Sequence, residues 1–187
     1  MTSTAPATPI RVAALVGSVR AGSVNRRLAE LLRDRAPEGV EVQIVEGLGD
    51  LPFYDDDVDA AGAPAAVERV REAIAAADRV LFVTPEYNGR MPAVLANVID
   101  WGSRPYAAGA LKGKPVAVVG ASFGRFGGVW AHDEARKSVG IAGGVALEKG
   151  LSATPTSPDL SGDEQLVSDA LAVLTELVAH EGETVAA

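Results

Sequence analysis

The sequence contains no cysteine. This absence excludes disulfide bonds, thiolate metal sites and dithiol redox chemistry, so any electron transfer by this protein requires a bound cofactor. Basic residues are also scarce, with 17 Lys and Arg against 25 Asp and Glu and a formal net charge of −8. Nucleic-acid binding needs clustered Lys and Arg, so this balance argues against it, although a local loop can still bind a small anion.

Long apolar runs are missing as well, since none reaches the roughly 20 residues that span a bilayer. Residues 1–9 have neither the charged nor the apolar region of a secretory signal, so the expected location is the cytoplasm. Only 5% of the 187 residues are aromatic, and the 48% apolar content comes mainly from Ala and Val. We expect a flexible arm over residues 1–9, a single domain over 10–181 and a tail over 182–187.

Apolar segments of strand length alternate with amphipathic segments of helix length. The strands are expected at residues 10–16, 40–45, 80–83, 115–119 and 145–147, because these runs are β-branched or uniformly apolar. The helices are expected to begin near Val24, Pro64, Pro92, Gly128 and Asp163, with a polar loop over residues 55–62. This alternation predicts an α/β fold with a five-stranded parallel sheet and helices on both faces.

The loop after the first strand is rich in hydrogen-bond donors. It runs Gly17-Ser18-Val19-Arg20-Ala21-Gly22-Ser23-Val24-Asn25. Its polar side chains lie beside the free N–H groups of a helix N-terminus, which favours anion binding, and the alternative is an ordinary turn with a Ser or Asn cap. A P-loop would need a lysine before Ser23, and a Rossmann fingerprint would need a glycine at Ser18 or Val19, so the phosphate of a mononucleotide is the better match.

Two further loops follow predicted strands and should meet the first at the carboxyl edge of the sheet. The segment 84–92 places Glu86, Tyr87 and Asn88 between two prolines, which suits a rigid loop beside a flat heterocycle. The segment 121–128 contains three glycines that permit close backbone approach. Each could instead be a plain surface turn, but their shared position strengthens the case for a ligand site.

Other polar residues have simpler interpretations. Asp55 to Asp57 are adjacent and cannot all converge on one ion, and neither His132 nor His180 has a partner at metal-ligand spacing. We therefore expect a solvated loop for the aspartates and no metal. His132 is expected on a helix surface, and the alternative is a position near the ligand pocket or a subunit interface. Trp101 is expected to pack in the core or an interface.

These motifs together resemble the NADPH-dependent FMN reductase family, which includes bacterial quinone, chromate and azo-dye reductases. The first motif is Gly17-Ser18-x-Arg20-x-x-Ser23-x-Asn25, and the third is Ser122-x-Gly124-x-x-Gly127-Gly128. The second is Pro85-Glu86-Tyr87-Asn88 followed by Pro92, Leu95, Asn97, Ile99, Asp100 and Trp101. The resemblance covers residues 10–147, and it departs at Ala96, where the family usually has lysine.

The resemblance implies a flavodoxin-like fold with strand order 2-1-3-4-5 and FMN at the carboxyl edge. The residues it implies at the ribityl phosphate are Ser18, Arg20, Ser23, Val24 and Asn25. Those it implies along the isoalloxazine are Pro85, Glu86, Tyr87, Asn88 and Gly89, with Ser122, Gly124 and Gly127 on the opposite side. It also implies a homodimer or homotetramer.

The implied activity is hydride transfer from NADPH or NADH through FMN to a small acceptor, such as a quinone, free flavin, an azo compound or chromate. Because the flavin carries the chemistry, no obligatory acid–base residue is expected. Backbone N–H groups near Asn88 and Gly89 could stabilise negative charge on the reduced ring. Arg90 or Arg125 is a candidate for the phosphates of the nicotinamide cofactor. The alternative is a flavodoxin-type electron carrier that binds FMN without oxidising NAD(P)H.

Overall fold

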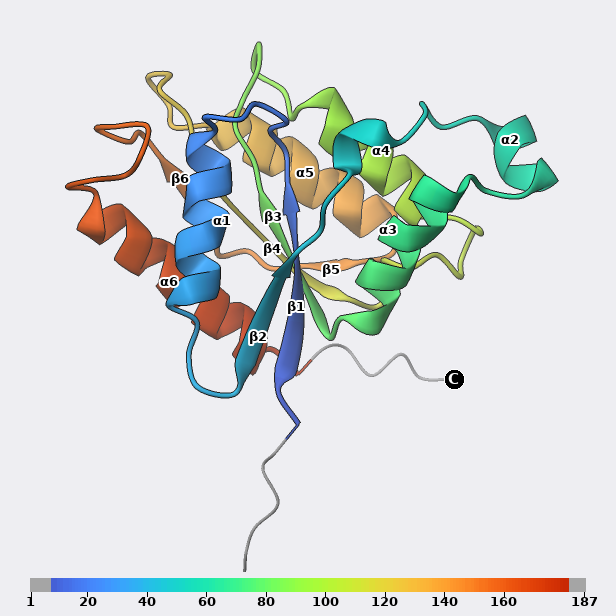
Figure 1. Cartoon of the computed structure of the whole chain (residues 1–187), viewed down its shortest axis with the longest axis horizontal. Helices are drawn as coiled ribbons and strands as arrows, with labels where there is room; N and C mark the ends of the chain where they lie inside the picture. The colour runs from blue at the N-terminus through green and yellow to red at the C-terminus, as the bar shows by residue number, and fades with distance from the viewer. Residues whose placement is uncertain (1–7, 182–187) are drawn as a thin grey trace, which may run out of the picture.

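The computed structural model describes residues 8–181, so the expected C-terminal tail and most of the expected N-terminal arm lie outside the described residues. Strands and helices alternate along the chain (Figure 1). The strands are β1 (Ile10–Val16), β2 (Val40–Ile44), β3 (Arg79–Val83), β4 (Pro115–Ala121), β5 (Val145–Ala146) and β6 (Leu151–Ala153). The helices are α1 (Val24–Asp34), α2 (Asp56–Ala61), α3 (Ala65–Ala76), α4 (Ala93–Gly102), α5 (Val129–Ile141) and α6 (Glu164–Ala179), with a 3-10 turn η1 (Leu48–Asp50).

The sheet is parallel, with the strand order β2-β1-β3-β4-β5 that the sequence predicted. The expected number of strands is wrong, because β6 also pairs with β4. Strand β5 pairs with Pro115 and Val116 at the start of β4, and β6 pairs with Val119–Ala121 at its end. Two short strands therefore share one edge of β4. With only three residues, β6 is too short to show a periodic pattern in the sequence.

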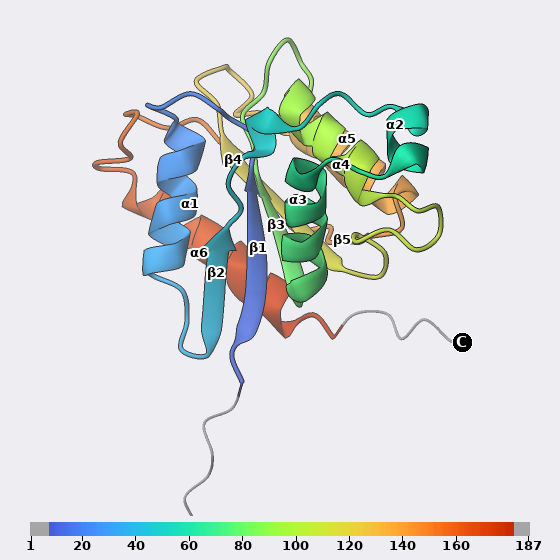
Figure 2. The ribbon, with the colours of Figure 1, turned by 45° about the vertical axis from the view of Figure 1, so that its right-hand side comes forward.

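Helices cover both faces of the sheet, as expected. Figures 1 and 2 show α1 and α6 on one face and α3, α4 and α5 on the other. In β1, Val12, Ala14 and Val16 belong to the core under α1 and α6, while Ala13 and Leu15 belong to the core under the other helices. Burial on both faces explains why the central strands are apolar at almost every position.

The segment expected to be a polar loop contains helix α2. Its residues are all at least partly exposed, so no apolar periodicity marked it in the sequence. Asp55 caps the helix, because its carboxylate accepts from the N–H groups of Asp57 at 2.8 Å and Val58 at 3.3 Å. Asp56 instead accepts from the hydroxyl of Tyr54. The neighbouring aspartates thus face different partners.

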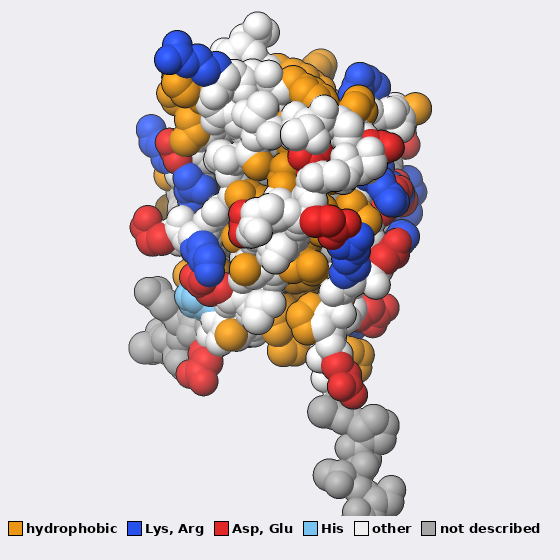
Figure 3. All heavy atoms as spheres, turned by 90° about the vertical axis from the view of Figure 1, so that its left-hand side faces the viewer, with side chains coloured by type: hydrophobic (Ala, Val, Ile, Leu, Met, Phe, Trp, Pro, Cys, Tyr) orange, Lys and Arg blue, Asp and Glu red, His pale blue; other side chains and the backbone are white. Residues whose placement is uncertain are grey.

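Charges of both signs are interspersed with small apolar groups on the side of the molecule where α1 and α6 lie (Figure 3). One ion pair, Arg35–Glu164 at 2.8 Å, joins the end of α1 to the start of α6. Both side chains are largely exposed, so this pair contributes little to stability. Within residues 8–181, no helix is long and apolar enough to cross a membrane.

Candidate functional site

Three loops meet at the carboxyl edge of the sheet, which is the upper edge in Figure 1. They follow β1, β3 and β4, and they enclose a cleft of about 350 Å³. The cleft is lined by Ser18, Arg20, Ser23, Val24, Asn25, Pro85, Glu86, Tyr87, Ala121, Ser122, Phe123 and Gly124. Ten of the predicted cofactor-binding residues are in this lining, and Asn88, Gly89 and Gly127 lie in the same loops beyond it. The tertiary structure therefore brings the three motifs together.

The first loop leads into the N-terminus of α1. Ser23 caps this helix, since its hydroxyl accepts from the N–H of Arg26 at 3.2 Å. The first turn of α1 contains no acidic residue, so the partial positive charge of the helix end is not neutralised locally. Arg20 is exposed and its guanidinium donates to the carbonyl of Gly22 at 2.8 Å. The cap interpretation of this loop is thus correct, and a capped N-terminus with a nearby cation can also bind an anion.

Asn25 lies in the cleft lining, but its side chain is committed to the protein backbone. Its amide nitrogen donates to the carbonyl of Ala121 at 2.8 Å, and its amide oxygen accepts from the N–H of Ala121 at 2.9 Å. The side chain is almost completely buried. This two-way contact joins the start of α1 to the end of β4, so Asn25 holds two walls of the cleft at a defined distance.

The second loop is a tight hairpin that projects above the sheet. Tyr87 and Arg90 exchange backbone hydrogen bonds of 3.0 and 3.1 Å across Asn88 and Gly89. Both turn residues have positive φ, 53° at Asn88 and 71° at Gly89, which is why an Asn-Gly pair occurs here. Tyr87 is about half exposed, at 52%, beside the cleft.

This hairpin is attached to α5 at both ends. The carboxylate of Glu86 accepts from the N–H groups of Trp130 at 3.0 Å and Ala131 at 3.1 Å, so it caps the helix N-terminus. On the other side, Glu134 accepts from Arg90 and from the N–H of Met91. Glu86 therefore supports the loop that was predicted to line the isoalloxazine.

The third loop packs against β6. Ser122 N–H donates to the carbonyl of Ala153 at 3.0 Å. Gly127 has a φ of +61°, and a Cβ there would lie 2.9 Å from the backbone of Ala153, so only glycine fits. The half-exposed rings of Phe126 and Trp130 contact each other, with centroids 4.8 Å apart.

His132 was expected on a helix surface, and that expectation is wrong. Its side chain is fully buried beneath the loops, where Nδ1 lies 2.6 Å from the hydroxyl of Ser152 and Nε2 lies 3.0 Å from the carbonyl oxygen of Thr84. Burial lowers the pKa of His132, which favours the neutral ring. Sequence periodicity could not identify this position, because the polar partners are distant in the sequence, one directly after β3 and the other in β6.

Trp101 packs in the core, as predicted. It is 1% exposed, its indole N–H donates to the carbonyl of Pro52 at 2.9 Å, and its ring meets that of Tyr54 edge to face. Asn97 supports the same segment by accepting from the N–H of Tyr54 and donating to Pro52. These contacts anchor the chain between η1 and α2 on helix α4.

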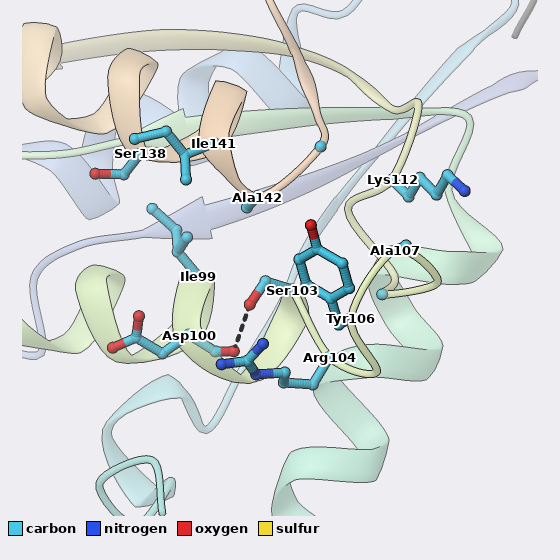
Figure 4. Close-up of a pocket in the computed structure, with 12 residues that line it drawn as sticks. Ile99, Asp100, Ser103, Arg104, Tyr106, Ala107, Lys112, Ser138, Ile141 and Ala142 are labelled. Carbon is cyan, nitrogen blue, oxygen red and sulfur yellow. Dashed lines mark hydrogen bonds between the residues drawn. The ribbon is translucent and has the colours of Figure 1, made fainter. Parts of the chain in front are cut away.

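A second cavity, of about 470 Å³, lies between the C-terminal ends of α4 and α5 and the segment 103–112 (Figure 4). Ile99, Ile141 and Ala142 form its apolar side, and the ring of Tyr106 stands opposite them. Because the helices run antiparallel to the strands, this cavity lies at the amino edge of the sheet. Ligands of open parallel sheets bind at the carboxyl edge, so the cleft between the three loops is the candidate active site.

Comparison with known proteins identifies the family of this chain. The sequence model of NADPH-dependent FMN reductases matches residues 10–159, which include all three loops. The chain belongs to this family. A quinone reductase of Pseudomonas putida is 49% identical over 128 residues, which cover 68% of each chain. An NAD(P)H-dependent FMN reductase of Pseudomonas aeruginosa is 45% identical over 130 residues, covering 70% of this chain and 69% of the relative.

Solved structures of other proteins show the same architecture. The flavoenzyme NAD(P)H:(acceptor) oxidoreductase of Paracoccus denitrificans superposes with a TM-score of 0.79 at 32% identity, over 91% of this chain and 96% of the other. A flavodoxin, WrbA-like protein of Agrobacterium tumefaciens shares the fold, with a TM-score of 0.60 at 19% identity over 92% and 99% of the two chains. The protein is accordingly a flavodoxin-like, FMN-dependent NAD(P)H oxidoreductase.

The residues of the cleft fit FMN. An uncompensated helix N-terminus and the nearby Arg20 suit a phosphate, and the half-exposed rings of Tyr87 and Phe123 suit a flat heterocycle. The volume of about 350 Å³ is in the range of small-ligand pockets, which begins at about 300 Å³.

Proposed function

We propose that the cleft holds the FMN phosphate at the start of α1, with Ser18 and Arg20 as side-chain donors. The isoalloxazine would lie between the hairpin that carries Tyr87 and the loop that carries Ser122 and Gly124. The observation that supports this proposal most directly is the convergence of an unneutralised helix N-terminus and two aromatic-bearing loops on one cleft. Bound FMN supplies the redox chemistry, transferring reducing equivalents from NAD(P)H to the acceptor.

The side chains then serve for binding and positioning. Asn25 and Glu86 keep the cleft walls in place through their backbone contacts. The N–H groups of Asn88 and Gly89 are the proposed donors to the ring. For the phosphates of the nicotinamide cofactor, Arg125 is the better candidate, because Arg90 is paired with Glu134 whereas Arg125 lies over the ring of Phe126.

The proposed acceptor is a small quinone. Relatives with 39–49% identity include quinone reductases of Pseudomonas putida and Escherichia coli, and a planar acceptor could stack in a cleft bordered by aromatic rings. We also propose a homodimer or homotetramer acting in the cytoplasm, where NADH and NADPH are supplied. The large exposed apolar side chains of Tyr106 and Ile141 support self-association.

Anaerobic stopped-flow experiments test this function. Purified protein reconstituted with FMN should lose its flavin absorbance in a fast, saturable phase after NADPH or NADH is added, and should recover it when a quinone is added. Tight FMN binding without bleaching by either nucleotide would instead favour an electron carrier, which the enzymatic relatives do not favour. Absence of FMN binding would refute the proposed cleft.

A further inference from the structure

His132 is a buried polar residue that no motif of the sequence includes. It lies in the first turns of α5, and its ring occupies space next to Gly120 in β4, where a Cβ would lie 2.8 Å from Nε2. Both ring nitrogens have polar partners, Ser152 in β6 and Thr84 directly after β3. Since β4 lies between β3 and β6, the ring connects two strands across a third.

The partners of His132 determine its tautomer. The carbonyl oxygen of Thr84 can only accept, so Nε2 must carry the hydrogen. In the neutral ring, Nδ1 is then an acceptor for the hydroxyl of Ser152. Burial favours this neutral form by lowering the pKa of His132, and nearby Arg136 lowers it further. The hydrogen bond to Thr84 and the charges of Glu86 and Asp133 act in the opposite direction without reversing the shift.

The contact with Thr84 replaces a hydrogen bond of the sheet. Thr84 N–H donates to the carbonyl of Val119, so in a parallel ladder the carbonyl of Thr84 should accept from the N–H of Ala121. Ala121 N–H instead donates to the amide oxygen of Asn25. The carbonyl of Thr84 is left for His132. Asn25 approaches from α1 and His132 from α5, which cover opposite faces of the sheet.

The backbone hydrogen bonds between β3 and β4 therefore stop where the two chain segments reach the cleft, at Thr84 and Ala121. Thr84 directly precedes Pro85 of the second loop, and Ala121 directly precedes Ser122 of the third. Ser152 precedes Ala153, whose carbonyl holds the N–H of Ser122. A change at His132 would consequently move both loops that face each other across the cleft.

We propose that His132, in its neutral Nε2–H form, is a positioning residue that sets the spacing between the two loops at the flavin. This role rests on the proposed function of the cleft. Gln at position 132 can retain a donor at the ε position for Thr84, whereas Asn retains only a polar atom at the δ position and Leu retains neither. The variants His132→Gln, His132→Asn and His132→Leu therefore separate the contact with Thr84 from the filling of space.

The experiment measures FMN affinity by fluorescence quenching, together with the rate of flavin reduction by NADPH and the thermal midpoint of the apoprotein. We expect His132→Gln to bind FMN within about threefold of wild type, and His132→Asn and His132→Leu to bind it about tenfold more weakly, the equivalent of one hydrogen bond. Val139→Ala, which removes buried apolar atoms on the same helix, is the control for lost stability alone. It should lower the midpoint without changing FMN affinity.

Three results would overturn the proposal. The first is equal FMN affinity of the Gln and Leu variants, and the second is a loss of affinity in Val139→Ala as large as that in His132→Leu. The third is a ¹⁵N NMR spectrum of the apoprotein that assigns the hydrogen of His132 to Nδ1. Failure of the wild type to bind FMN would refute the proposed cleft, and with it any flavin role of His132. An Nε2–H spectrum in that protein would still agree with a hydrogen bond from His132 to Thr84.

Discussion

Gly120→Ala should be among the most disruptive small substitutions in this protein. A Cβ at Gly120 would lie 2.0 Å from the carbonyl oxygen of Thr84 and 2.8 Å from Nε2 of His132. The first contact is between the new Cβ and a backbone oxygen, so no change of rotamer relieves it. The backbones at Gly120 and Thr84 must therefore separate by about 1 Å. Such overpacking costs about 1–3 kcal/mol. Loss of the hydrogen bond between His132 and Thr84 adds about 1–3 kcal/mol.

Together these losses amount to about 2–6 kcal/mol, a large part of the 5–15 kcal/mol by which domains are stable. The assay is urea unfolding of the apoprotein followed by circular dichroism. Gly140→Ala is the matched control, because Gly140 lies in α5 with an ordinary φ and open space around its Cβ position. It should stabilise the protein by about 0.5–1 kcal/mol. A loss below about 1 kcal/mol in Gly120→Ala would refute the packing described at the cleft.

Three other perturbations give distinct expectations. Because burial lowers the pKa of His132, the unfolded chain binds the proton more readily than the folded one. The free energy of unfolding should therefore fall as pH drops below about 6.5, by up to about 1.4 kcal/mol per pH unit. Urea midpoints of wild type and His132→Gln that change in parallel between pH 5 and 7 would contradict this. Arg20→Ala should weaken FMN binding about tenfold and make it less sensitive to salt without shifting the thermal midpoint, and titrations at two salt concentrations check both effects. Asn25→Ala should destabilise the apoprotein by about 2–4 kcal/mol in urea unfolding, because it leaves the buried N–H and carbonyl of Ala121 unpaired. A loss below about 1 kcal/mol would count against the two-way contact between Asn25 and Ala121.

Most of the fold follows from local patterns. The uniformly apolar runs of β1, β3 and β4 could be recognised because these strands are buried on both faces. Helix α3 could be recognised for a different reason, because its one buried face leaves Val67, Val70 and Ile74 at helical spacing. Helix α2 and strand β6 were missed, since one has no buried residue and the other has three residues. Elements of this kind depend on caps and on strand pairing rather than on periodicity.

The candidate site, like the fold, could be predicted from the sequence only in part. The sequence by itself determined which loops carry polar and glycine residues, and the order of the strands then brings those loops to one edge. Only the tertiary structure decided how individual side chains are used. Asn25 holds Ala121, and His132 reaches Thr84 through the space left by Gly120. Such contacts join residues far apart in the chain, so the spacing of residues along the sequence cannot predict them.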